Sequence, residues 1–420
     1  MCKISKVIGR EILDSRGIPT VEADVYLKNG IIGRASVPSG ASTGSKECLE
    51  LRDKNKNYFF GMGVTKSVSK INKIISKEII GMNVNDQSNI DKTMIETDGT
   101  YNKSNIGANS ILAVSLAVLK AASLYNKLEP YEYIAEICGN KNLFMPIPMI
   151  NILNGGKHSN NNIDIQEFMI QPFNSKSFKN SVRIGSEIFH ILGRMIKKMG
   201  FNTSVGDEGG YSINLPSNEE ALVLMKKAVN LSNFEINKDV VFSIDCAASE
   251  FFNKKENLYV FSNENKKFTS KQFTNYLKDL SEKYPIVSIE DGLHENDING
   301  YIYQTNLLKE KIKIVGDDLF ATNYILLKKY ANLGIANSII IKPNQIGTFT
   351  ETIKTIKLAN KLKYSTIVSH RSGETEDTII SDLAVGTKSK YIKIGSMSRV
   401  DRISKYNRLI RIEEMLLNNI

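Results

Sequence analysis

Six short apolar runs in the second half of the chain each stop at an ionisable residue. The residues at these positions are Asp245, Glu290, Asp317, Lys342, His370 and Lys393. They are separated by 45, 27, 25, 28 and 23 residues, and the last four intervals fit one strand, a loop, a helix and a return to the next strand. We therefore expect these side chains at the same end of successive parallel strands.

The length of this region favours one architecture among the parallel folds. About 275 residues run from Pro146 to Ile420, close to the roughly 250 of a (β/α)8 barrel, and they hold too many strand and helix pairs for a small open sheet. In such a barrel the loops that follow the strands open at one face, which carries the active site. The six ionisable residues are thus predicted at the mouth of a barrel.

The first third of the chain has a different pattern. Alternating apolar residues over 20–27 and 31–37, joined by an Asn-Gly turn, predict an antiparallel hairpin. Apolar residues at helical spacing predict helices over residues 65–80 and 107–125. This part is expected to be a mixed α+β unit.

Residues 139–142 contain one glycine and two asparagines and are expected to link two domains. The predicted boundaries are 1–138 for an N-terminal α+β capping domain and 139–420 for the barrel domain. The longest apolar stretch, Ile111–Leu119, is interrupted by Ser115 and is about half as long as a membrane span. It is expected to be a buried helix, and no membrane association is predicted.

The N-terminal segment and the cysteines indicate a reducing compartment. Residues 1–17 carry six charged side chains and lack the apolar stretch of a secretory signal. Cys2, Cys48, Cys138 and Cys246 form no CxxC pair, so neither a disulfide framework nor a zinc knuckle is indicated. We expect a cytoplasmic protein.

The chain is basic overall. Lys and Arg number 55 against 45 Asp and Glu, a formal net charge of +10. Such an excess suits a polyanionic partner such as RNA, or a phosphorylated substrate. The basic residues are scattered among Asn and Ile, without a long basic run or an aromatic stripe, so compositional drift is favoured over nucleic-acid binding by about four to one.

The three acids at the ends of the first runs predict a metal site. Asp245, Glu290 and Asp317 would repel one another across a barrel mouth, so their convergence requires a cation. Oxygen ligands without a neighbouring Cys or His pair favour Mg²⁺. A single acid of this kind more often caps the next helix, but three in register with two lysines reverse that preference.

Lys342 and Lys393 each follow an isoleucine at the end of a later run. Such a lysine lies near a dication, another ammonium group and a wall that excludes water. It is therefore expected to have a lowered pKa and to act as a general base. One lysine is sufficient for that role. The other can remain charged and bind an anionic group of the substrate.

Two earlier segments add carboxylates to the expected mouth. Glu167, in the run 163–168, and Glu208, in the glycine-rich segment 205–210, can serve as a general acid and its orienting partner. Glycine-rich turns are also common for purely structural reasons. This pair alone therefore leaves both interpretations open.

Three further features suit an anionic ligand. His158 follows a strand and a tight turn, and His370 is followed by Arg371 and Ser372, which together suit a phosphate group. The loop Pro38–Lys46 is rich in small residues and suited to closing over an anion or a metal, although a flexible turn is an equal alternative. It is not a P-loop, because its glycines are too close together.

These motifs, in this order, resemble those of the enolase family from about residue 4 to residue 417. The segments that carry the resemblance are DSRGIPTVE from Asp14, PSGASTG from Pro38, NGGKH from Asn154, VGDEGG from Val205, DCAASEF from Asp245, SIEDG from Ser288, GDDLF from Gly316, IKPNQIG from Ile341, SHRSGETED from Ser369 and GSMSR from Gly395. The amino-acid sequences of these segments are similar to those of bacterial enolases.

The resemblance implies a small α+β domain followed by a TIM-like barrel with ββαα(βα)6 topology, assembled as a homodimer. It also implies a lyase that reversibly dehydrates 2-phosphoglycerate to phosphoenolpyruvate, with two Mg²⁺ ions per active site. Lys342 would remove the C2 proton, and Glu208, helped by Glu167, would protonate the leaving hydroxyl group.

By the same resemblance, the remaining residues would bind the ions and the substrate. The first Mg²⁺ would be held by Asp245, Glu290 and Asp317, and the second by Ser42 when its loop closes. Substrate contacts would come from His158, Gln166, Glu167, His370, Arg371, Ser372 and Lys393.

Three residues depart from the family pattern. Ile18 stands where Asn is usual, Ile298 where an aromatic residue is common, and Ile394 where Thr usually follows the substrate lysine.

Two other functions stay open on the sequence: a sugar-acid dehydratase or racemase with the same three-carboxylate site, and a non-catalytic basic RNA-binding or scaffold protein. Arg371-Ser372, the Ser42 loop and the length of the match argue against the first alternative, and the intact ionisable residues at every catalytic position argue against the second.

Overall fold

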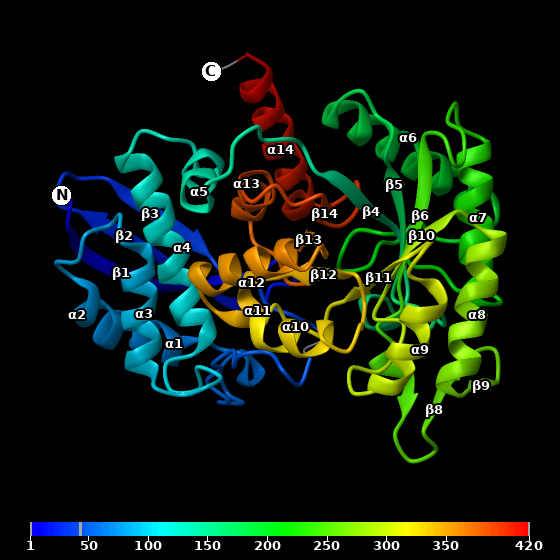
Figure 1. Ribbon diagram of the computed structural model, residues 1–420, viewed down its shortest axis with the longest axis horizontal. Helices are drawn as coiled ribbons and strands as arrows, with labels where there is room; N and C mark the ends of the chain where they lie inside the picture. The colour runs from blue at the N-terminus through cyan, green and yellow to red at the C-terminus, as the bar shows by residue number, and fades with distance from the viewer. Residues whose placement is uncertain (1, 42–43, 419–420) are drawn as a thin grey trace.

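The computed structural model describes residues 2–41 and 44–418 and shows a three-stranded sheet with its helices beside a closed barrel (Figure 1). The antiparallel sheet has the order β1-β2-β3, formed by β1 Ile4–Leu13, β2 Pro19–Leu27 and β3 Ile32–Ser36. The predicted hairpin is β2 and β3, and Gly30 in its turn has a φ of 90°, a value that glycine adopts without strain. Strand β1 was not predicted.

Helix α4, Ala108–Tyr125, packs on this sheet and confirms the predicted buried helix. Among the described residues it is the one helix long and apolar enough to cross a membrane, yet 83% of that stretch is buried inside the protein. It is therefore the core helix of this region. The other helical segments are η1 Phe59–Gly61, α1 Thr65–Lys70, η2 Ile71–Ile75, α2 Ser76–Ile79, α3 Gln87–Asp98 and α5 Pro130–Cys138. The segments α1, η2 and α2 are continuous and form the helix predicted over residues 65–80.

Eight strands close into the barrel in the order β10-β11-β12-β13-β14-β4-β5-β6. They are β4 Ile147–Asn154, β5 Glu167–Pro172, β6 Val240–Asp245, β10 Ile286–Glu290, β11 Lys313–Gly316, β12 Ser338–Ile341, β13 Ser365–Ser369 and β14 Tyr391–Lys393. Strand β5 is antiparallel to β4 and β6, and the other neighbouring pairs are parallel. Because β5 runs in the opposite direction, its first residue lies at the end where the other strands finish.

The chain order confirms the predicted ββαα(βα)6 topology. Strands β4 and β5 are followed by α6 Phe178–Lys198 and α7 Asn218–Asn230, and then by six βα units. The helices of these units are α8 Ser270–Lys283, α9 Ile298–Leu308, α10 Tyr324–Ala331, α12 Phe349–Lys361, α13 Ile379–Gly386 and α14 Val400–Asn418. The loops carry η3 Gly156–His158, η4 Ala248–Phe251, α11 Pro343–Ile346 and a small sheet of β7 Phe252–Asn253, β8 Leu258–Phe261 and β9 Lys266–Phe268.

Polar side chains at the helix starts explain where most of these helices begin. Ser177, Ser217, Thr269, Asp297 and Thr348 each accept a hydrogen bond from a backbone N–H in the first turn of the helix that follows. Such caps satisfy N–H groups that have no partner within the helix.

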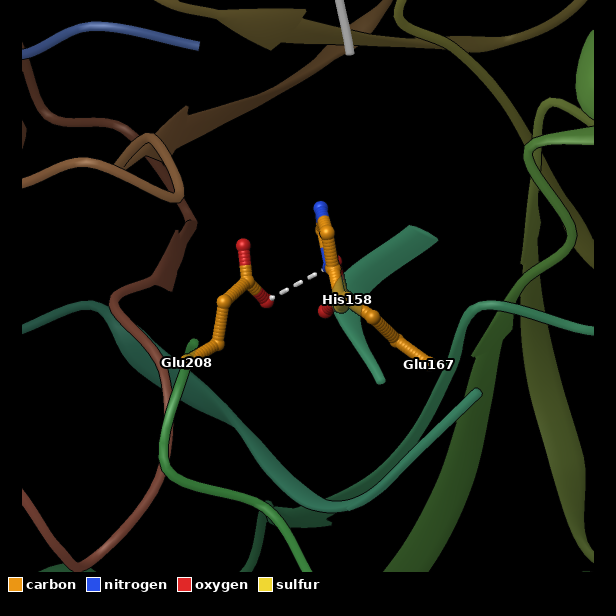
Figure 2. A group of neighbouring side chains, drawn as sticks. All are labelled: His158, Glu167 and Glu208. Atoms are coloured by element: carbon orange, nitrogen blue, oxygen red, sulfur yellow. Dashed lines mark ion pairs between the residues drawn. The ribbon is translucent and has the colours of Figure 1, made fainter. Parts of the chain in front are cut away.

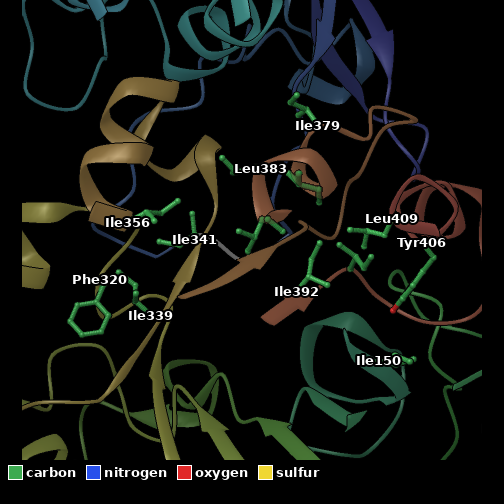
Figure 3. Packing of buried hydrophobic residues seen from close by; sticks show 14 of the residues in the cluster. Ile150, Phe320, Ile339, Ile341, Ile356, Ile379, Leu383, Ile392, Tyr406 and Leu409 are labelled. Atoms are coloured by element: carbon green, nitrogen blue, oxygen red, sulfur yellow. The ribbon is translucent and has the colours of Figure 1, made fainter. Parts of the chain in front are cut away.

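Side chains alternate between the two faces of the barrel strands. Ile339, Ile341 and Ile392 belong to the outer core that the surrounding helices cover (Figure 3). The intervening positions form a separate apolar cluster of Met149, Met169, Val315, Ile340, Ile367 and Tyr391. Because successive residues of a strand point to opposite faces, this cluster, which we call the inner layer, fills the barrel interior.

Candidate active site

The ammonium group of Lys393, at the end of β14, lies among three carboxylates at the barrel mouth. Its Nζ is 2.8 Å from Asp245 Oδ2, 2.9 Å from Glu290 Oε2 and 3.1 Å from Glu167 Oε1. All four side chains are buried. Asp245 and Glu290 end β6 and β10, and Glu167 starts the reversed strand β5, so the strand directions bring these residues together.

The second lysine of the mouth is paired with the third predicted metal ligand. Lys342 Nζ forms a short ion pair with Asp317 Oδ2, and Asp317 Oδ1 accepts a hydrogen bond of 2.9 Å from Gln345 Nε2. Burial lowers the pKa of Lys342, but the Asp317 carboxylate outweighs it, and the pKa of this lysine is raised. The nearest charged neighbour of Lys342 in this arrangement is an acid, and its lowered pKa beside a dication stays a prediction.

A histidine and two glutamates form a second cluster at the mouth, which shares Glu167 with the first (Figure 2). His158 Nδ1 lies 3.4 Å from Glu208 Oε2 and 3.5 Å from Glu167 Oε1. Burial opposes a charge on His158, yet the Glu208 carboxylate prevails and raises the pKa of His158 to about 10. Burial and the Glu208 charge raise the pKa of Glu167 to about 7, whereas the two neighbouring histidines hold the pKa of Glu208 well below its usual range, against the effect of burial.

The predicted phosphate-binding pair faces a loop of the N-terminal region. Arg371 donates from Nη1 to Glu47 Oε2 at 2.8 Å and from Nη2 to Glu47 Oε1 at 3.2 Å. Ser372 Oγ accepts a hydrogen bond of 2.6 Å from the backbone N–H of Ala41. This loop therefore rests on the barrel mouth, while Ser42, the predicted ligand of a second ion, lies outside the described residues.

Most of the predicted site residues line one small cavity. Its volume is about 20 Å³, so a small-molecule substrate needs its walls to move apart. The lining residues are His158, Gln166, Glu167, Glu208, Asp245, Asp317, Lys342, Ser369, His370, Arg371, Ser372 and Lys393. Glu290 is fully buried and pairs with Lys393, one of the lining residues. Within the described part of the chain, Gln166 Oε1 and Glu167 Oε2 are buried without a hydrogen-bond partner, as expected of groups that await a ligand.

The donor set of the mouth fits a hard divalent cation. Asp291, Asp317 and Asp318 place carboxylate oxygens within 4.8 Å of one another. Burial and the charges of Asp317 and Asp245 raise the pKa of Asp291 to about 7, and burial and Asp245 likewise raise that of Glu290. Buried acids that repel one another in this way are stabilised by a cation, and oxygen ligands suit Mg²⁺.

Sequence reasoning missed three acids of this site. Asp291 and Asp318 directly follow Glu290 and Asp317, and the Glu-Asp and Asp-Asp pairs were the available signal. Glu47 follows the small-residue loop, and no pattern in the sequence links it to Arg371, which is 324 residues away.

Fold and mouth together define a barrel protein with an acid- and lysine-lined site at the strand ends, covered by a loop of an α+β region. Two family models account for almost the whole chain. The model described as "Enolase, N-terminal domain" matches residues 4–134, and "Enolase, C-terminal TIM barrel domain" matches residues 142–420. The chain belongs to the enolase family.

Proposed function

We propose that the protein is a Mg²⁺-dependent lyase that reversibly dehydrates 2-phosphoglycerate to phosphoenolpyruvate, as in glycolysis and gluconeogenesis. The observation that carries the proposal is the mouth itself. Two lysines lie against the three strand-end acids, and Arg371-Ser372 lines the same cavity. The site thus offers positively charged groups to the phosphate and the carboxylate of the substrate, and a lysine to the carbon that loses its proton.

Asp245, Glu290 and Asp317 would hold the first Mg²⁺, and Ser42 would contribute to a second ion. When bound, Mg²⁺ supplies positive charge that stabilises the extra negative charge on the substrate carboxylate after proton removal. Lys393 already pairs with two of these acids, which supports a site suited to positive charge.

Lys342 would act as the base that removes the C2 proton. Its pairing with Asp317 keeps its proton in place. Once Asp317 is engaged elsewhere, burial, Arg371 and Lys393 lower the pKa of Lys342, and the more weakly acting Glu290 raises it. A deprotonated lysine in a dry site is a competent general base.

Glu208, helped by Glu167, would protonate the leaving C3 hydroxyl group. In the described arrangement His158 holds the proton of its pair with Glu208, so an anionic substrate must raise the pKa of Glu208 before it can act. Glu167, whose pKa is about 7, is the other candidate acid. Comparing Glu208→Gln with Glu167→Gln separates the two, because only loss of the acid should block hydroxyl departure while C2 proton exchange persists.

His158, Gln166, His370, Arg371, Ser372 and Lys393 would contact the substrate. The guanidinium fork of Arg371 matches the geometry of a phosphate, and Glu47 holds this fork in place at the mouth. The three departures from the family pattern, Ile18, Ile298 and Ile394, are not among the residues that line the cavity. They leave the proposed chemical groups unchanged.

We also propose a cytoplasmic homodimer of the bacterial type, without a membrane or nucleic-acid partner. An apolar surface suited to self-association lies on the loop after β3. Tyr58, Phe59, Phe60 and Met62 are exposed there by 39, 40, 95 and 40%. Exposed aromatic clusters of this kind mark interfaces more often than isolated apolar residues do.

The direct test follows the ultraviolet absorbance of the enol product from 2-phosphoglycerate, first with Mg²⁺ and then with a chelator. Turnover that disappears on chelation is expected. Sugar acids assayed beside 2-phosphoglycerate address the dehydratase and racemase alternative, and turnover of a sugar acid alone would replace the proposal. Salt-sensitive RNA retention without any lyase activity would favour the scaffold alternative.

A further inference from the structure

Arg402, in the first turn of α14, is a fully buried arginine beside the mouth. Its guanidinium donates to His370 Nδ1 at 2.6 Å and to the carbonyl oxygens of Arg371 at 2.5 Å, Ser372 at 2.6 Å and Asp207 at 3.1 Å. Its Nε lies 2.9 Å from an Asp401 carboxylate oxygen. A buried guanidinium with this many partners is fixed in position.

These partners belong to the two chain segments that carry the proposed chemistry. Arg371 and Ser372 follow β13 and would bind the phosphate, while Asp207 immediately precedes the proposed acid, Glu208. The packing is tight, since a Cβ on Gly395 would lie 2.8 Å from Arg402 Cδ and 2.9 Å from the Glu208 carbonyl oxygen. Arg402 therefore fixes the distance between the phosphate side and the acid side of the cavity.

The contact with His370 also determines where that ring carries its hydrogen. An arginine has donors only, so its bond to His370 Nδ1 requires an unprotonated Nδ1. The neutral ring then carries its hydrogen on Nε2, which lies 3.3 Å from Glu208 Oε1. Burial, assisted by the positive charge of Arg402 and opposed by Glu208, lowers the pKa of His370 to about 4, which agrees with a neutral ring at neutral pH.

We propose that Arg402 is a positioning residue that holds His370 as the Nε2–H tautomer, with this N–H on the side of the ring nearest to Glu208. Through the carbonyl oxygens of Arg371 and Ser372, it also holds the phosphate clamp at a fixed distance from the acid. The kinetic part of this role rests on the proposed function. The tautomer of His370 does not, because it follows from the hydrogen bonds of the protein alone.

The tautomer is measured by ¹⁵N NMR of the full-length protein labelled on histidine. The chain has four histidines, and the signals of His370 are assigned by their loss in His370→Gln. At neutral pH we expect an unprotonated Nδ1 and a protonated Nε2 in the unmodified protein. Finding His370 as the Nδ1–H tautomer or as an imidazolium would overturn the proposal, whether or not any variant folds.

Arg402→Met removes the donors and keeps much of the side-chain volume. We expect loss of the single Nε2–H pattern of His370 and a kcat for 2-phosphoglycerate lowered on the order of 10- to 100-fold, the usual effect of losing a group that orients a functional histidine. Arg402→Lys retains the charge without the planar fork. In both readouts it should fall between the unmodified protein and Arg402→Met. Arg411→Met, an exposed arginine of the same helix, is the matched control and should change neither readout.

An unchanged His370 spectrum in a folded Arg402→Met variant would also refute the positioning role. If the spectra behave as expected while the unmodified protein does not convert 2-phosphoglycerate, the proposed function fails and the role of Arg402 in setting the His370 tautomer stands. The spectroscopic and kinetic measurements thus separate the two claims.

Discussion

The inner face of the barrel has two regions built by the same strands, and they differ in what stabilises them. The inner layer consists of buried apolar side chains such as Ile340 and Tyr391, each worth about 1.5–3 kcal/mol of transfer free energy. Two residues further along the same strands, the mouth holds Lys342 and Lys393 among buried acids. Because the desolvation of a buried ion pair can cost as much as the pairing gains, the layer supports the fold, whereas the charged mouth adds little to stability and suits a chemical role.

The sharpest way to separate the two regions is to remove the proposed base. Lys342→Ala should lower kcat by roughly 10²- to 10⁴-fold, the usual contribution of a general base, while far-ultraviolet circular dichroism stays unchanged. Ile340→Val, which changes a residue of the inner layer on the preceding strand β12, is the control. It should lose about 0.5–1.5 kcal/mol of unfolding free energy and keep its turnover. Unchanged turnover in Lys342→Ala would remove Lys342 from the role of base.

The next prediction concerns the stability of the mouth and its response to Mg²⁺. Lys393→Met leaves Asp245 and Glu290 without their ammonium partner, so in chelator it should lose about 3–5 kcal/mol of unfolding free energy. Mg²⁺ should restore more of that loss than it adds to the unmodified protein, because a cation replaces the missing charge. Urea unfolding with and without Mg²⁺ measures both quantities.

The inner layer supplies the matched comparison for Lys393→Met. Ile340→Ala should lose about 2–5 kcal/mol of unfolding free energy, and Mg²⁺ should stabilise it no more than it stabilises the unmodified protein. If Mg²⁺ stabilises both variants equally, the claim that Lys393 occupies a place meant for positive charge is wrong.

The smallest effect is expected from pH. The pKa of His370 in the folded protein is about 4, below the ~6.5 of an unfolded histidine. Between these values the unfolded chain binds a proton that the folded protein does not, so stability is present above pH ~6.5 and is lost as the pH falls toward 4. The upper bound on the loss is about 3 to 4 kcal/mol, since a tenfold difference in proton affinity is worth about 1.4 kcal/mol.

The contribution of His370 is isolated by comparing variants in urea unfolding across this pH range. His370→Gln should flatten the pH dependence relative to the unmodified protein, whereas His190→Gln, which removes an exposed histidine of α6, should leave it unchanged. A curve for His370→Gln that parallels the unmodified protein would show that His370 is not held neutral by its surroundings.

Much of the fold was predictable because it depends on local patterns. The apolar runs with ionisable ends place Asp245, Glu290 and Lys393 at one end of the barrel, since parallel strands all finish at the same end. The alternating hairpin and the apolar helix α4 follow from similarly short segments. The reversal of β5 came only from the family resemblance, because no short pattern in the sequence encodes a strand's direction.

The rest of the site depends on contacts between residues far apart in the chain. The pairing of Lys342 with Asp317 raises the pKa of this lysine, and the sequence specifies neither side-chain torsions nor the closest partner of a charge. The Glu47 contact with Arg371 joins two regions separated by 324 residues. Arg402 lies on a helix with no unusual motif, and only its burial and its four hydrogen bonds reveal it.

The central claim is that Asp245, Glu290 and Asp317 share a divalent cation at the mouth. Anomalous diffraction from a crystal grown with Mn²⁺ and 2-phosphoglycerate tests it most directly. We expect a peak coordinated by these three carboxylates, with Lys393 turned toward the substrate. A peak bound only by Asp291 and Asp318, or by His158 with Glu167 and Glu208, would contradict it, as would a mouth without any peak.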